Sequence, residues 1–321
     1  MLPKLSRFLK IVREINLDAI RERAEAPCRI AVVADDPGDR EAMAALLMGD
    51  ADASHPWLSL VSPDQVGASI ADQAPDLALI VSRTGEVPAS LESARGMLVS
   101  KKMPVVTALI GAFSQRDVLP RRGEQRRIAL PSLAPDQADA LATSLFDLVA
   151  PDTRIALARQ FPGLRKPLFD QIIEETSRAN ASYAFSTGVA EIVPLLDVPL
   201  NIGDIVVLTK NQAIMAYRIA LAAGKTGRPA DVIGELIGVV GGSLLWRQIA
   251  REMIGLIPVI GIIPKVAVAY GGTWAIGHAA VAWATGAEDA TRRSVRRLYA
   301  AGLVRGRKIA RQIAARSSHA A

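Results

Sequence analysis

The feature that most constrains the fold of this chain is an alternation of short apolar runs and helical patterns over its first half. Most of the runs contain four to six residues, a length typical of buried strands. They lie at Ile30–Val33, Leu58–Val61, Leu77–Val81, Val105–Ile110 and Ile128–Leu130. Helical patterns lie between and after them, near 40–48, 65–73, 88–101 and 136–149. This alternation predicts a mainly parallel sheet with helices on both faces.

The pattern changes after the Pro-Asp pair at 151–152, where we place a domain boundary. Beyond it the sequence predicts helices near 153–160, 165–190, 203–223, 229–254, 265–285 and 289–316. The fold class is therefore an α/β sheet domain followed by an all-α apolar helical domain. The expected divisions are an amphipathic N-terminal helix at 1–27, the sheet domain at 28–152, the helical domain at 153–288 and a basic amphipathic tail at 289–321.

The first 27 residues predict an amphipathic helix that packs on its own domain or a partner, or lies on a membrane surface. Charged residues such as Arg7 and Lys10 interrupt any continuous apolar segment, so the stretch does not resemble a secretory signal peptide. The single cysteine, Cys28, excludes an internal disulfide framework. We expect it to be a small buried apolar residue.

The loop after the first strand resembles a phosphate-binding loop in position but not in chemistry. A P-loop has the pattern G-x-x-x-x-G-K-[ST] between a strand and a helix. The matching positions here hold Ala34, Asp39, Arg40 and Glu41, and two more acids lie between the first two. Because negative charge in a tight loop repels a polyphosphate, the sequence predicts no bound nucleotide and no other cofactor.

The order of elements over about 29–150 nevertheless resembles an Era-like GTPase. The stretch "PDLALIVSRTGEVPASLESARGMLVSKKMPVVTALIGAF" is similar to the strand–helix–strand that leads to the guanine-reading N-K-x-D motif of that family. The corresponding positions here are Ile110, Gly111, Ala112 and Phe113, and no D-x-x-G is present in "LVSPDQVGA". The resemblance implies a P-loop-GTPase-like domain that lacks its nucleotide motifs; an α/β domain of another lineage is the alternative.

The second half resembles the bacterial domain of unknown function family 697, which often follows Era-like GTPase domains. The resemblance covers about 185–285 and rests on "DIVVLTKNQAIMAYRIALAAG" and "LLWRQIAREMIGLIPVIGIIPKVAVAYGGTWAIGHAA". The matching positions are Asp204, Leu208, Thr209, Gln212, Met215, Arg218, Ile219, Ala220, Arg247, Gln248, Pro258, Gly261, Ala269, Tyr270 and Gly277. The resemblance implies an association with membranes and with GTPases, and no particular chemistry.

The apolar segment at 253–283 has two interpretations. It inserts into a membrane or docks tightly on one, or it forms a soluble helical core. The segment 266–283 has eighteen residues, at the lower limit for a membrane span, and it is rich in alanine and glycine. "GLIPVIGIIP" is too short to cross a bilayer and is twice interrupted by proline. Lys265 could extend toward lipid headgroups from this region.

The tail carries the basic excess of a chain whose net charge is +6. Its candidate contact residues are Arg292, Arg293, Arg296, Arg297, Arg305, Arg307 and Lys308, to which we add Lys265. They are interleaved with apolar residues, a pattern that favours anionic lipid headgroups. A solvated helix face or a protein contact is the alternative. Nucleic acid is disfavoured, since the tail has one tyrosine and no stacking pattern.

The sequence yields no candidate catalytic or metal-binding residues. Its three histidines, His55, His278 and His319, have no ligand at metal spacing, and no nucleophile elbow is present. We therefore expect a non-enzymatic membrane-associated scaffold, a partner of an active GTPase or a homo-oligomer, at the cytoplasmic face of the inner membrane. The alternatives are a soluble, cytoplasmic regulatory or oligomerisation protein and a divergent GTP-binding protein.

Overall fold

The computed structural model describes residues 17–49, 55–72, 74–113, 119–120, 125–192, 201–239, 262–287 and 292–320. The chain forms two compact units. One is Glu22–Leu168, and the other combines Met1–Arg21 with Phe169–Ala321. The division falls inside helix α8 (Arg165–Ile192), about one helix later than the boundary expected at 151–152. Most of the expected N-terminal helix lies outside the described residues.

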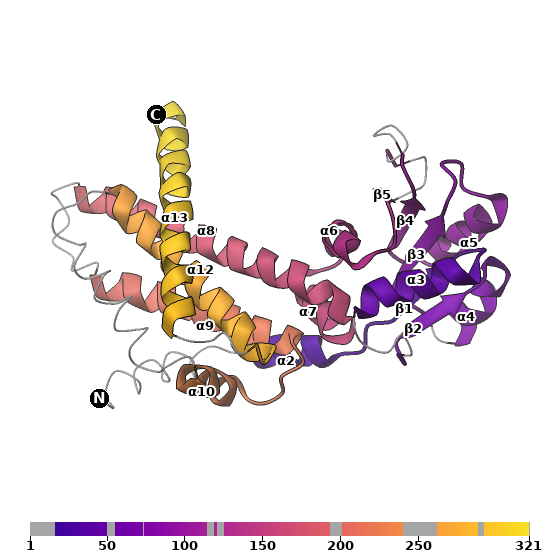
Figure 1. Ribbon diagram of the computed structural model, residues 1–321, viewed down its shortest axis with the longest axis horizontal. Coiled ribbons are helices and arrows are strands. Elements are labelled where there is room, and N and C mark those ends of the chain that lie inside the picture. Colours follow the sequence, from indigo (N-terminus) through magenta and orange to yellow (C-terminus); the bar gives the residue numbers. More distant parts are fainter. Residues whose placement is uncertain are drawn as a thin grey trace. The chain divides into compact units, whose positions relative to one another are not determined.

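The α/β unit is built on a five-stranded, wholly parallel sheet (Figure 1). Its strands are β1 (Ile30–Val33), β2 (Leu58–Val61), β3 (Leu77–Ser82), β4 (Val105–Ile110) and β5 (Arg126–Leu130). They follow the spatial order β2-β1-β3-β4-β5, which is a doubly wound arrangement. Every residue of β1, β3 and β4 is buried, which explains why these strands appear in the sequence as continuous apolar runs. The predicted parallel α/β sheet is confirmed.

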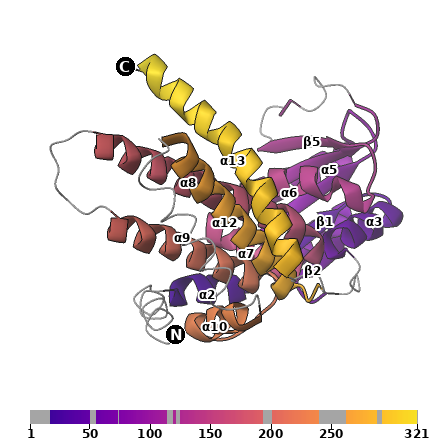
Figure 2. The same cartoon turned by 60° about the vertical axis from the view of Figure 1, so that its left-hand side comes forward.

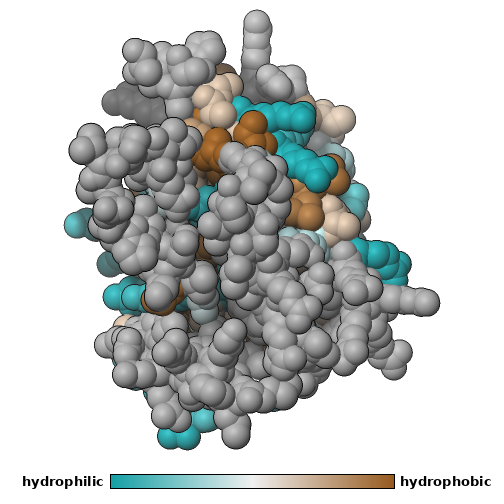
Figure 3. Space-filling view, turned by 90° about the vertical axis from the view of Figure 1, so that its left-hand side faces the viewer, coloured by the Kyte–Doolittle hydropathy of each residue, from teal (hydrophilic) through white to brown (hydrophobic). Residues whose placement is uncertain are grey.

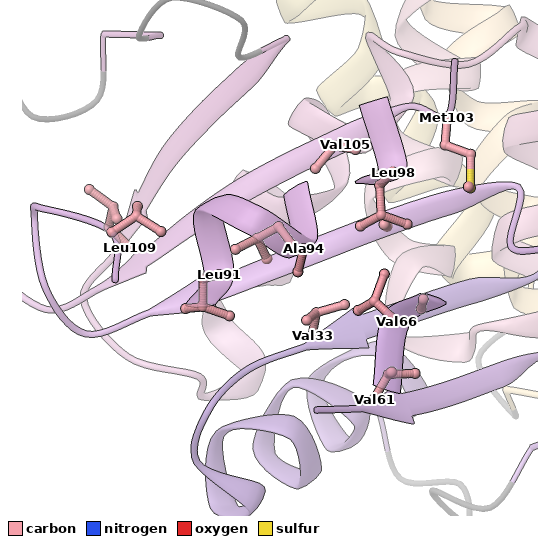
Figure 4. Close-up of a cluster of buried hydrophobic side chains, with 13 residues drawn as sticks. Val33, Val61, Val66, Leu91, Ala94, Leu98, Met103, Val105 and Leu109 are labelled. Carbon is pink, nitrogen blue, oxygen red and sulfur yellow. The ribbon is translucent and has the colours of Figure 1, made fainter. Parts of the chain in front are cut away.

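Helices of the α/β unit cover both faces of the sheet. They are α3 (Pro37–Met48), α4 (Val66–Asp72), α5 (Ala89–Ser100), α6 (Ala138–Phe146) and α7 (Pro151–Gln160); α2 (Asp18–Glu25) precedes the sheet, and the turns η1 (Pro63–Gln65), η2 (Pro135–Gln137) and η3 (Pro162–Leu164) connect elements. Val33, Ile80 and Val105 form one apolar cluster with Leu91 and Leu98 of α5 (Figure 4). Since parallel crossovers are right-handed, the reversal of strand order puts α3 on the opposite face.

The second unit is helical. It contains α9 (Asn201–Ala222), α10 (Pro229–Val239), α12 (Ile262–Ala284) and α13 (Arg292–Ala320), together with most of α8. The segment 266–283 lies inside α12 and is largely buried in the protein. Among the described helices, none combines the length and the hydropathy that a membrane span requires. Most of "GLIPVIGIIP" lies outside the described residues, as do the family-697 positions Arg247, Gln248, Pro258 and Gly261.

Helices α12 and α13 pack together through small residues and lie side by side in both cartoon views (Figure 1, Figure 2). A Cβ atom added at Gly306 would lie 2.5 Å from the carbonyl oxygen of Ala267, and one added at Gly302 would lie 2.8 Å from that of Gly271. The two contacts run in opposite directions along the two helices, so the pair is antiparallel. Such spacing, small residues four apart on each helix, allows the backbones to touch.

A buried hydrogen-bond network joins three helices of this unit around Thr273 of α12. The amide nitrogens Nδ2 of Asn180 and Nε2 of Gln212 both donate to the Thr273 hydroxyl oxygen, at 2.9 and 3.1 Å. That hydroxyl donates in turn to the carbonyl oxygen of Ala269. Asn211 Nδ2 donates to Asn180 Oδ1 at 2.8 Å. Because each bond depends on a fixed helix position, the network holds α8, α9 and α12 in one register.

We predict that Gly306→Ala destabilises the helical unit by about 1–3 kcal/mol, because the added methyl group meets the α12 backbone. The matched control is Gly234→Ala in α10, where a Cβ atom meets nothing within 4 Å. The control should stabilise by about 0.5–1 kcal/mol, since alanine is the better helix former. Urea unfolding followed by circular dichroism measures both; equal effects of the two variants would contradict the close contact.

A second pair of variants tests the buried network. Thr273→Val keeps the side-chain shape but leaves two buried amide groups without an acceptor, which costs about 1–3 kcal/mol for each group. Ser177→Ala in α8 removes a hydroxyl that is fully buried and has no hydrogen-bond partner in the described part of the chain. It should therefore leave the unfolding midpoint unchanged or raise it. A Thr273→Val protein as stable as the wild type would show that the network contributes nothing.

Candidate functional site

The first candidate site is the edge of the sheet at the carboxyl ends of β1 and β3, which we call the crevice after the place where doubly wound folds bind ligands. Strand order reverses between these two strands, and ligands of doubly wound sheets bind at such a reversal. The loop Ala34–Asp36 and the first turn of α3 line it from β1, and Arg83 follows β3. This is the position at which the GTPase resemblance would place the phosphates of a nucleotide.

The loop after β1 presents carbonyl oxygens to its own arginine. Nη1 of Arg40 donates to the carbonyl oxygen of Ala34 at 2.5 Å and to that of Asp35 at 3.3 Å. A phosphate cradle instead requires backbone N–H groups that converge on the ligand. Arg40, at the position of the P-loop lysine, thus binds the loop itself.

The acids of the crevice are paired as well. Asp36 caps α3, and its Oδ1 accepts from the Gly38 backbone N–H at 2.9 Å, so the donor that would meet an anion is already engaged. The buried Asp39 carboxylate accepts Nε of Arg83 at 3.0 Å on each oxygen. This hydrogen bond and the charge of Asp39 raise the pKa of Arg83. The hydroxyl of Ser90 in α5 donates to Asp35 at 3.0 Å.

The position at which the GTPase resemblance would place guanine is apolar. Phe113, at the last position of the guanine-reading motif, packs against the hydrophobic cluster shared by β1, β3 and α5. The polar groups that line the crevice bind one another, and the partly buried Phe113 offers no hydrogen-bonding group, so these positions do not supply what the motifs of a GTPase supply. Arg83 and Ser90 could not be assigned to the crevice from the sequence, because their partners lie 44 and 55 residues away.

The second candidate site is the outward face of α13. The helix contains nine Lys or Arg residues and no acid. Its exposed basic residues are Arg297, Arg305, Arg307, Lys308, Arg311 and Arg316. Gly302, Gly306, Ile309 and Ala310 are buried. At 3.6 residues per turn they lie opposite Arg297, Arg307, Lys308 and Arg311, while Arg305 and Arg316 lie at the margin of the exposed side. We call the exposed side the basic face.

Arg305 is the basic-face residue with a defined contact inside the unit. Its guanidinium carbon lies 5.3 Å from the ring centroid of Trp274 in α12, a cation–π distance. The ring centroid of His278 lies 4.0 Å from that of Trp274, and burial lowers the pKa of His278. By contrast, Arg297, Arg307 and Lys308 form no ion pair with any acid in the described ranges.

The other predicted contact residues are Lys265, which belongs to α12, and three arginines whose side chains are not among those the structure describes. Lys265 is half-buried in the first turn of α12, and the antiparallel register brings it to the end of the pair that holds Lys308. Arg292, Arg293 and Arg296 belong to the first turns of α13, and their side chains are outside the described set. On the face shown in Figure 3, hydrophilic and hydrophobic side chains lie next to one another where residues are described.

Cys28 is buried as expected, and burial with the charge of Asp76 raises the pKa of its thiol to about 12. Within the described residues, no cluster of three or more histidine, cysteine or acidic side chains has the geometry of a metal site. No protein-family model, curated protein or solved structure matches this chain. Both family resemblances therefore stay predictions that rest on the quoted motifs.

We predict that GTP does not stabilise this protein. A ligand at about a hundred times its Kd raises the free energy of unfolding by about 2.7 kcal/mol, which a thermal shift detects easily. With GTP and Mg²⁺ at about 1 mM, the Tm should equal that measured in sodium sulfate of the same ionic strength. A Tm that rises with GTP and not with sulfate would overturn our interpretation of the crevice.

Proposed function

We propose that this chain is a non-enzymatic scaffold that docks on a membrane through the basic face of α13. Its lipid partners are anionic headgroups, and the cytoplasmic face of the inner membrane is the surface we propose. The α/β unit keeps a ligand-binding architecture but uses it as a protein-binding platform, for an active GTPase or a second copy of the chain. The observation that carries the proposal is the outward basic face.

The charges of α13 support lipid docking because the helix contains no acid and because Arg297, Arg307 and Lys308 are exposed and have no ion pair in the described part of the chain. A helix with nine cations and no acid has a strong field close to its surface. Each Lys or Arg near an anionic leaflet contributes about 1 kcal/mol, so several of them suffice for reversible binding. The field decays within a Debye length of about 8–10 Å, so binding of this kind weakens in salt.

The filled crevice supports a scaffold role for the α/β unit. Its polar groups bind one another: Arg40 donates to the carbonyl oxygen of Ala34, and Arg83 pairs with Asp39. Strand β2 pairs with β1 and forms an edge of the sheet, and Leu60 on it is 40% exposed. An exposed apolar residue on an edge strand is a feature that protein partners use.

Vesicle sedimentation tests the docking proposal. We predict that the protein pellets with vesicles of equimolar phosphatidylglycerol and phosphatidylcholine, and not with phosphatidylcholine alone. The double variant Arg307→Gln/Lys308→Gln should bind about thirtyfold more weakly, which is the loss of two contacts of about 1 kcal/mol each. Salt at about 0.5 M should release the wild type, since it shortens the Debye length to a few ångström.

The matched control is Lys101→Gln/Lys210→Gln, which removes the same charge from exposed positions outside α13. It should bind as the wild type does. An equal loss in both double variants would show that net charge, not the basic face, drives binding. Tighter binding to a duplex DNA or an RNA than to the anionic vesicles, in the same buffer, would replace the lipid by nucleic acid as partner.

A further inference from the structure

The basic face has an apolar centre. Val304 is 67% exposed, the largest fraction among the large apolar side chains that are exposed in the described part of the chain. Arg297 and Arg311 lie seven residues before and after it, and Lys308 lies four residues after it. Residues at these spacings share one side of a helix. Val304 therefore lies in the middle of the basic face.

Its immediate neighbours extend this apolar centre. Ala300 and Ala301, four and three residues before Val304, are also exposed. Together the three residues form a narrow apolar strip, with Arg297 at one end and Lys308 and Arg311 at the other. The side of α13 that packs on α12 contains Gly302 and Gly306, so the strip cannot turn inward without breaking that contact.

The distribution of charge favours an extended anionic surface as the occupant. The exposed basic residues run from Arg297 to Arg316, about 28 Å of helix at 1.5 Å per residue. Of these, Arg297, Arg307, Lys308 and Arg311 lie within about 60° of Val304 around the helix, so a bilayer surface meets these four at once. An apolar centre of valine and alanine does not favour nucleic acid, because bases stack on aromatic rings.

We propose that Val304, flanked by Ala300 and Ala301, enters the boundary between headgroups and acyl chains when α13 docks on an anionic bilayer. This inference rests on the proposed function and adds how the helix is oriented. The basic side chains surround the strip and bind phosphate groups, while α13 lies in the membrane plane. Burial of the valine adds an apolar contribution to binding that salt does not screen.

An environment-sensitive fluorophore at Val304→Cys tests the insertion. The native thiol does not compete for the label, because Cys28 is buried and its pKa is raised to about 12. With nitrobenzoxadiazole as the label, we expect emission to shift to shorter wavelength and to rise severalfold on equimolar phosphatidylglycerol and phosphatidylcholine vesicles. Lipids that carry a quencher on the acyl chain should then quench it.

The matched control is Gln312→Cys, labelled in the same way. Gln312 is exposed on the same helix, but eight residues from Val304 and therefore about 80° around it. Its emission should change less, and acyl-chain quenchers should act on it weakly. Equal shifts at both positions would contradict an orientation with Val304 at the centre.

A second measurement is independent of the label. Val304→Gln should weaken vesicle binding about fivefold, and the loss should persist as salt is raised, because it removes an apolar contribution. Labelled Val304→Cys protein that pellets with vesicles without any change in emission would overturn the insertion and leave the docking proposal intact. Wild-type protein that does not pellet at all would overturn the docking proposal itself. Circular dichroism of each variant checks the helix content.

Discussion

The contact between the backbones of α12 and α13 is the constraint on which the helical unit depends. Gly302 and Gly306 of one helix meet Gly271 and Ala267 of the other, and no larger side chain fits between them. This contact fixes the rotation of α13 about its own axis. Once that rotation is fixed, Arg297, Arg307, Lys308 and Arg311 are exposed on the side away from α12, while Arg305 lies over Trp274. The basic face is a consequence of glycine packing.

The remaining buried contacts of the unit reinforce the same arrangement. Thr273 accepts two amide donors from α8 and α9 at the centre. The Tyr270 hydroxyl donates to Glu174 of α8 at 2.5 Å, and burial together with that carboxylate raises the pKa of Tyr270. Trp274 receives Arg305 from α13. Since α12 takes part in every one of these contacts, it is the central helix of the unit, which explains why a long apolar segment here is protein core.

The α/β unit has the strand order of ligand-binding sheets, but the polar groups of its crevice are hydrogen-bonded to other groups of the same unit. In many parallel sheets, open backbone donors at this edge bind an anion. Here a cap, two arginines and a serine bind the groups that line the crevice. The sequence "ADDPGDRE" gives the charges of this loop, but it does not show which groups pair. Asp39 and Arg83 are 44 residues apart and belong to different crossovers of the sheet.

By itself the sequence determined the elements and their charge. Apolar runs gave the parallel strands, because strands buried on both faces need continuous apolar side chains. The basic composition of α13 and the acidic residues after β1 also follow from local residues. Only the tertiary structure decided which side of α13 carries its charge outward, where the two units divide and which groups the crevice arginines bind. These three outcomes depend on contacts between segments that are distant in the chain. The periodicity of a helix or strand indicates which residues are buried, but not which residues they contact.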